Sequence, residues 1–76
     1  MNYDELTYFI KRRIHIRLNA LDIDQRELAN RLGMSEVVLC RYVTGKRKIP
    51  HDVLIRIAQA LGCEPGYLIN INDTLE

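Results

Sequence analysis

The chain of 76 residues has no tryptophan, one phenylalanine, two cysteines and two prolines. Cys40 and Cys63 lie far apart and form no Cys-x-x-Cys pair, and His15 and His51 are not at metal-ligand spacing. The chain also lacks a polar triad and a phosphate-cradling glycine loop. These absences argue against an enzyme, a metal site and a cofactor, and they favour two reduced thiols.

Long apolar runs are absent as well, since no segment approaches the ~20 apolar residues of a membrane span. The first five residues lack the basic and apolar regions of a signal peptide. We therefore expect a cytoplasmic protein that does not enter a membrane. The length and the lack of repeats or linkers predict a single domain over residues 1–76, with a C-terminal tail at 70–76.

The net charge of +1 says nothing by itself about nucleic acid, but the charges are unevenly distributed. Residues 11–20 carry a local charge of +4, residues 40–60 carry +4, and residues 61–76 carry −3. Such polarisation can steer a polyanion even when the total charge is near zero. The arginines at 12, 13 and 17 lie either along a DNA flank or on an unrelated solvated face.

Apolar residues recur at helical spacing nearly throughout, which predicts an all-α fold. A first helix should begin near Asn2, since Asn2 and Glu5 have the spacing of a capping box. Residues 1–9 would form its extended start. One face of this helix should be a buried stripe, and a second, narrower stripe suggests that two sides are covered. The first stripe contains Leu6, Ile10, Ile14, Leu18 and Leu21, and the second contains Phe9, Ile16 and Ala20.

Four further helices are predicted from their start and stop signals. Asp24 and Glu27 repeat the capping-box spacing, so the second helix should start at Gln25. The second helix should end at Gly33. The third should be capped by Ser35 and run to about Thr44, with Gly45 closing it. The fourth should start at Pro50 and end at Gly62, and a short fifth should run from Pro65 to about Asn70.

The stretch from Gln25 to Thr44 meets the demands of a helix-turn-helix. Two helices that cross steeply with a short turn need a small inner residue, which Ala29 supplies. The turn needs a left-handed residue, and Gly33 adopts that conformation without steric cost. Apolar contacts on the inner side come from Leu28, Leu32, Met34, Leu39 and Tyr42. A helix pair of this shape fits the major groove of DNA, and the basic run at 46–48 fits a phosphate backbone.

The run from Gln25 through Gly45, together with Ile57-Ala58-Gln59-Ala60-Leu61-Gly62, resembles the lambda-repressor-like, Cro-type (XRE) helix-turn-helix family. The resemblance covers about residues 10–69. It implies a compact five-helix domain that binds double-stranded DNA as a homodimer on a pseudo-palindromic operator. It also implies transcriptional regulation, with repression as the expected form.

The family pattern also assigns contacts with DNA. Bases would be met by Glu36, Val37, Cys40 and Arg41, and phosphates by Gln25, Ser35, Thr44, Lys46, Arg47 and Lys48. The helical pattern agrees, because Leu39 and Tyr42 face inward and positions 36, 37, 40, 41 and 44 must then face outward.

The chemistry of the outward face suggests particular bases. Arg41 can bind guanine O6 and N7 with both branches of its guanidinium, and Val37 can meet a thymine methyl group. Glu36 either accepts a hydrogen bond from cytosine N4 or stabilises the positive end of its own helix. Thr44 either donates to phosphate or helps to end the helix, and His51 is either a cap or surface residue or a base reader.

The chain departs from the family pattern at two positions that, in the family, face each other between the first and third helices. Many members pair an arginine late in the first helix with a glutamate late in the third, and these positions are Leu18 and Val43 here. We expect an apolar contact in place of the ion pair, with Arg13 or Arg17 as substitute phosphate ligands.

A second function stays open, namely a protein-interaction or antitoxin-type module that uses the same fold to hold a protein partner. The apolar excess of the first helix and of residues 67–71 motivates it. The alternation of Tyr67, Ile69 and Ile71 fits either a short pairing strand or a packed last helical turn.

Overall fold

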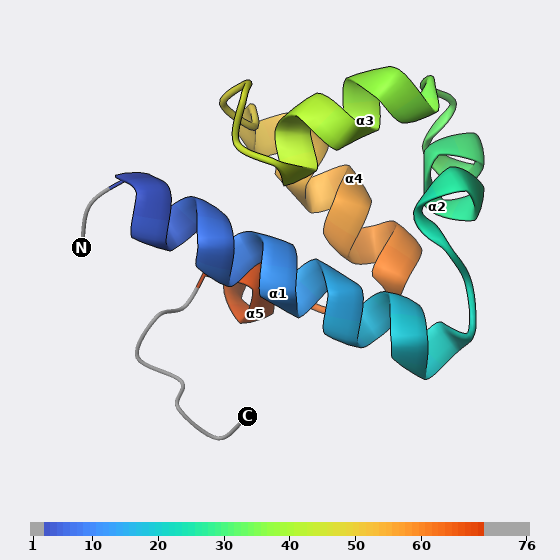
Figure 1. Cartoon of the computed structure of the whole chain (residues 1–76). Helices are drawn as coiled ribbons and strands as arrows, with labels where there is room; N and C mark the ends of the chain where they lie inside the picture. The colour runs from blue at the N-terminus through green and yellow to red at the C-terminus, as the bar shows by residue number, and fades with distance from the viewer. Residues whose placement is uncertain (1–2, 70–76) are drawn as a thin grey trace.

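The computed structural model describes residues 3–69, and these form five α-helices, as the sequence predicted. Figure 1 shows their order along the chain. The bounds are α1 Tyr3–Leu21, α2 Gln25–Leu32, α3 Glu36–Val43, α4 His51–Leu61 and α5 Pro65–Ile69. Each agrees with its predicted limits to about one residue. The proposed cap at Asn2, and Ile71 of the suggested strand, lie outside the described residues.

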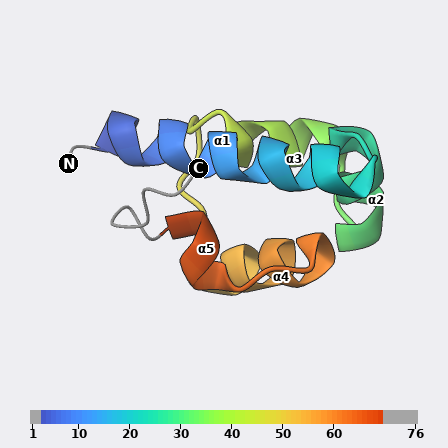
Figure 2. The same cartoon turned by 90° about the horizontal axis from the view of Figure 1, so that it is seen from below.

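The helices pack around one core, with α1 and α3 on one side and α4 and α5 on the other (Figure 2). Helix α4 contacts α1, α2 and α5, and α2 also packs against α3. The core is aliphatic and is built from every helix: Ile14, Leu18, Leu28, Ala29, Leu32, Leu39, Val43, Leu54, Ile57, Ala58, Leu61 and Leu68. Leu18 and Val43 are both buried in this cluster, and α1 packs against α3. Their direct contact, the expected substitute for the family's ion pair, stays a prediction.

Three helices end with the same hydrogen-bonding pattern. Asp22, Gly33 and Gly62 adopt φ values of 56°, 69° and 70°. In each case the next amide donates to the carbonyl five residues earlier, which satisfies carbonyls that the helix itself leaves free. The predicted stops at Gly33 and Gly62 are thus confirmed. Helix α3 differs, because its cap residue Thr44 stays right-handed and the left-handed residue is Gly45, at φ 81°.

The expectation that α1 is covered on two sides is wrong. In the second stripe, Ile16 is 36% exposed and Ala20 is exposed as well, and only Phe9 is half-buried, against Arg13. In the first stripe, Ile14 and Leu18 are buried, but Leu21 at its end is 37% exposed. Helix α1 packs against α3, α4 and α5, and α4 and α5 lie together on one side of it (Figure 2). Only one face can therefore be covered. No helix in the described part of the chain is both long and apolar enough to cross a membrane.

Candidate nucleic-acid interface

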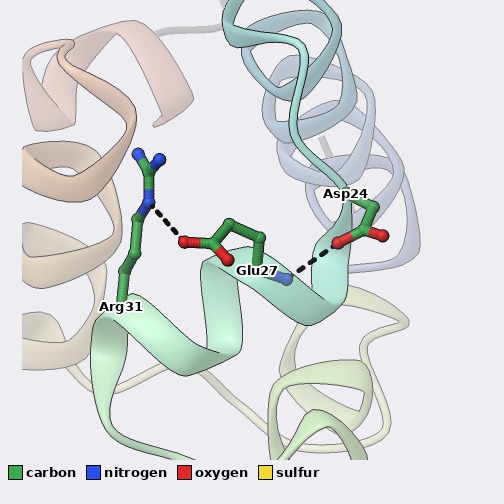
Figure 3. Close-up of polar contacts among 3 residues, drawn as sticks. All are labelled: Asp24, Glu27 and Arg31. Atoms are coloured by element: carbon green, nitrogen blue, oxygen red, sulfur yellow. Dashed lines mark hydrogen bonds and ion pairs between the residues drawn. The ribbon is translucent and has the colours of Figure 1, made fainter.

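The N-terminus of α2 is held by its capping residue. The Asp24 carboxylate accepts a hydrogen bond of 2.8 Å from the amide of Glu27, as predicted (Figure 3). The Glu27 carboxylate, however, does not turn back toward Asp24 but accepts a bond of 3.0 Å from Nε of Arg31, one turn later (Figure 3). The capping box is therefore formed on one side only. Its effect is to fix the first turn of α2 and the position of Gln25.

The turn between α2 and α3 has the geometry that the sequence demanded. Ala29 is 2% exposed, so the two helices approach closely over a small side chain. Gly33 requires glycine for its backbone conformation alone, because a Cβ there would meet nothing within 4 Å. Ser35 then caps α3 by accepting a bond of 3.1 Å from the amide of Val38. These contacts determine the angle at which α3 leaves the turn.

Helix α3 divides into an inner and an outer face. Leu39, Tyr42 and Val43 are buried, as the helical pattern required. The predicted base-contact residues are all exposed, and Val37 is exposed by 63% although it is aliphatic. An exposed aliphatic side chain among charged ones offers a partner an apolar contact. The predicted base-contact residues are Glu36, Val37, Cys40 and Arg41.

These residues do not stand alone, because they share one surface hollow with the start of α2 and the loop after α3. The hollow has a volume of about 420 Å³. It is lined by Gln25, Glu36, Val37, Cys40, Arg41, Thr44 and Lys46. Every one of the seven was predicted from the sequence to contact DNA. Arg41 and Lys46 bring two positive charges to this hollow against the single negative charge of Glu36.

The basic run at 46–48 does not act as one cluster. All three side chains are exposed, but only Lys46 lines the hollow beside α3. The guanidinium of Arg47 lies over the Tyr42 ring, 5.4 Å from its centroid, and Arg47 and Lys48 line a different groove against α1. A backbone bond of 3.1 Å from the Arg47 amide to the Arg41 carbonyl holds the loop against the end of α3.

Two hydroxyl groups near this face have partners within α3. Ser35 Oγ accepts from the helix, which leaves its own proton free to donate to a phosphate. Thr44 Oγ1 donates to the Cys40 carbonyl at 2.7 Å, which favours the helix-ending role over donation to phosphate. His51 is an exposed first residue of α4, behind Pro50 as the cap residue, so it is a surface residue rather than a cap.

Two of the arginines expected on a DNA flank or a solvated face are in neither place. Arg13 is 1% exposed, donates a bond of 2.9 Å to the Tyr67 carbonyl, and lies between the rings of Phe9 and Tyr67. Arg17 donates to the Leu61 carbonyl through Nε at 3.1 Å and Nη2 at 2.9 Å. The suggestion that either replaces the family's missing phosphate ligand is therefore wrong.

A third arginine has the same role, which sequence reasoning missed. Arg56 of α4 donates to the carbonyl of Leu32, the last residue of α2. The carbonyls bound by Arg17 and Arg56 end helices, and that of Tyr67 lies in the last turn of α5, where the helix dipole attracts a cation. A signal was present for Arg13 and Arg17, because neither α4 nor α5 has a basic residue in its own last turn. Helix α2 has Arg31 in its last turn, so this signal does not point to Arg56.

The cysteines have different environments. Cys63 is half-buried, and burial raises the pKa of its thiol while the Arg17 charge acts in the opposite direction. Cys40 is exposed on the outer face of α3. No group of three or more histidine, cysteine, aspartate or glutamate side chains within residues 3–69 could hold a metal ion.

The fold and the surface of α3 together define the class of a helix-turn-helix DNA-binding domain. The helix-turn-helix family model matches residues 14–68, so the chain belongs to this family, of the XRE and Cro–lambda-repressor-like type. Among solved structures, the chain is similar to the NMR structure of the DNA-binding domain of the P22 C2 repressor. The two share 28% identity with a TM-score of 0.74, over 95% of this chain and 90% of that one. The comparison with curated proteins found no match.

Proposed function

We propose that this protein is a sequence-specific regulator of transcription that binds double-stranded DNA as a homodimer on a pseudo-palindromic operator, in the cytoplasm. The expected action is repression. The observation that carries the proposal is the shared hollow, in which the outer face of α3, the first residue of α2 and Lys46 come together. The similarity to a phage repressor domain supports the same function.

The roles within the interface follow from side-chain chemistry. Arg41 pairs with guanine through two parallel hydrogen bonds, and Val37 packs on a thymine methyl group. Glu36 accepts from cytosine N4, and Cys40 meets a base edge beside it. Because a carboxylate is repelled by phosphates in general, Glu36 lowers affinity for most sequences and raises selectivity.

The phosphate contacts surround this reading surface. Gln25 and Ser35 lie at the N-termini of α2 and α3, where amide groups and the helix dipoles favour an anion. On the other side, Lys46, Arg47 and Lys48 follow the DNA backbone after α3, while Thr44 ends the helix beside them through its bond to the Cys40 carbonyl. This arrangement orients α3 in the major groove before any base is read.

Binding of fluorescently labelled duplex DNA of mixed sequence tests the proposal, with anisotropy measured at increasing salt. We expect binding at low salt that weakens steeply as salt rises, since each neutralised phosphate contributes about 0.9 to the logarithmic slope. Absence of binding to any duplex at low salt would contradict the proposal. Sedimentation with and without DNA tests the homodimer.

A further inference from the structure

The first turns of α1 approach the loop after α3 at one end of the molecule (Figure 1). A second groove is lined by residues of these two segments. Its volume is about 330 Å³, within the range of ligand-binding clefts. The floor is aliphatic and comes from separate segments of the chain, with Leu6, Ile10, Ile49 and Ile69 among its residues. The proposed DNA interface uses none of these four residues.

The rim of this groove is cationic. Arg47 and Lys48 line it, and both are exposed. Neither forms a salt bridge with another residue of the described chain. Arg47 is held in place by its contact with the Tyr42 ring, so one positive charge has a set position beside the aliphatic floor.

We infer that this groove binds an acidic peptide segment of a protein partner, through at least one large apolar side chain in the floor and carboxylates at Arg47 and Lys48. Charge complementarity selects an acidic partner, and a positive rim on an apolar floor repels a basic one. Nucleic acid does not fit this floor, because its sugar-phosphate backbone carries no aliphatic side chain large enough to fill it. Burial of a leucine-sized side chain contributes to affinity, and the ion pairs determine register.

The position of the rim links this site to DNA binding, a step that rests on the proposed function. Arg47 and Lys48 are also proposed phosphate ligands, whereas Lys46 lines the other hollow. A peptide and DNA would compete for the same two charges. Because such coupling is reciprocal, the peptide weakens DNA binding by the factor by which DNA weakens peptide binding.

The test uses a short fluorescein-labelled peptide that alternates aspartate and leucine. Two matched peptides replace either each aspartate with asparagine or each leucine with serine. We expect saturable binding of the first peptide, and binding at least about tenfold weaker for the other two. Lys48→Ala and Ile69→Ser should each weaken it about fivefold or more, while Lys46→Ala leaves it unchanged. Thermal unfolding of each variant confirms that it is folded.

Three results would overturn the inference: no saturable binding of the alternating peptide, equal binding of its serine counterpart, or no effect of Ile69→Ser. DNA binding is measured on the same samples. Peptide binding that depends on Ile69 and Lys48 in a protein that binds no duplex supports the groove and contradicts only the proposed function. DNA binding without peptide binding contradicts the groove and leaves the proposed function standing.

Discussion

The basic side chains fall into two groups that look alike in the sequence. One group, called the inner arginines for their bonds to other helices, contains Arg13, Arg17 and Arg56, which donate to backbone carbonyls in the last turns of neighbouring helices. Arg13 is buried and Arg17 is half-buried, whereas Arg56 is exposed and reaches the end of α2 from the surface. The outer cations, Arg41, Lys46 and Lys48, are exposed around α3 and the loop after it. The inner group uses its charge to hold helices together, and the outer group leaves its charge available for a partner. What separates the two groups is whether the side chain donates to a backbone carbonyl of another helix.

The largest expected effect comes from the inner group. Arg13→Ala should lower the free energy of unfolding by about 3 kcal/mol, because it removes two desolvated ring contacts and a hydrogen bond. Arg12→Ala is the matched control, since Arg12 precedes Arg13 in the chain and is exposed, and its effect should stay within about 0.5 kcal/mol. Urea unfolding followed by circular dichroism measures both. Equal free energies of unfolding for the two variants would contradict the claim that the inner arginines stabilise the fold and that exposed ones without such bonds do not.

The second largest effect on stability is expected at Gly45, where the loop after α3 meets Thr7 of α1. Gly45 is left-handed, and a Cβ there would overlap the methyl group of Thr7. Gly45→Ala should therefore lower the free energy of unfolding by about 2 kcal/mol. Gly33→Ala carries the same backbone strain but meets no neighbouring atom, so it should lower the free energy of unfolding by about 1 kcal/mol. Thermal unfolding separates them. If adding Thr7→Ala to Gly45→Ala recovers no stability, steric overlap is not the cause.

The third effect belongs to the outer group. Arg41→Ala should weaken binding to the preferred operator by about 1–3 kcal/mol and leave binding to unrelated duplexes nearly unchanged. The free energy of unfolding should change by less than about 0.5 kcal/mol, because Arg41 is exposed. Anisotropy titrations with both kinds of duplex measure the difference. An equal loss of affinity for both kinds of duplex would indicate that Arg41 contacts phosphate rather than a base.

The smallest effect is at Lys46. Lys46→Ala should reduce the logarithmic salt slope of DNA binding by about 0.9 for all sequences alike. Lys46→Arg keeps the charge and should restore the slope. Titrations at several salt concentrations measure this quantity, and an unchanged slope in Lys46→Ala would place the ammonium group away from the phosphates.

The limits of the helices were predictable because their signals are local. Asp24 and Ser35 each cap a helix through an amide three residues later, and Gly33 and Gly62 end helices by their own backbone conformation. The outward face of α3 was predictable for the same reason, since a helical period relates residues only a few positions apart. Such signals do not depend on where the rest of the chain lies.

The inner arginines were not predictable in the same way. Arg17 and the carbonyl it binds are 44 residues apart, and Arg13 and Tyr67 are 54 apart. A pattern of charge in the sequence cannot distinguish an arginine that reaches a distant helix end from one in water. The exposed Ile16 and Ala20 show the same limit, because apolar spacing cannot tell how many sides of a helix find a partner.

The central claim is that the outer face of α3 reads DNA while the inner arginines only support it. Selection of bound duplexes from random DNA, run in parallel with the wild-type protein and with Arg41→Ala, tests it most directly. We predict a pseudo-palindromic site for the wild type, and for the variant the same site with its guanine preference lost at one symmetric pair of positions. Failure to enrich any site, or an identical site for both proteins, would contradict the claim.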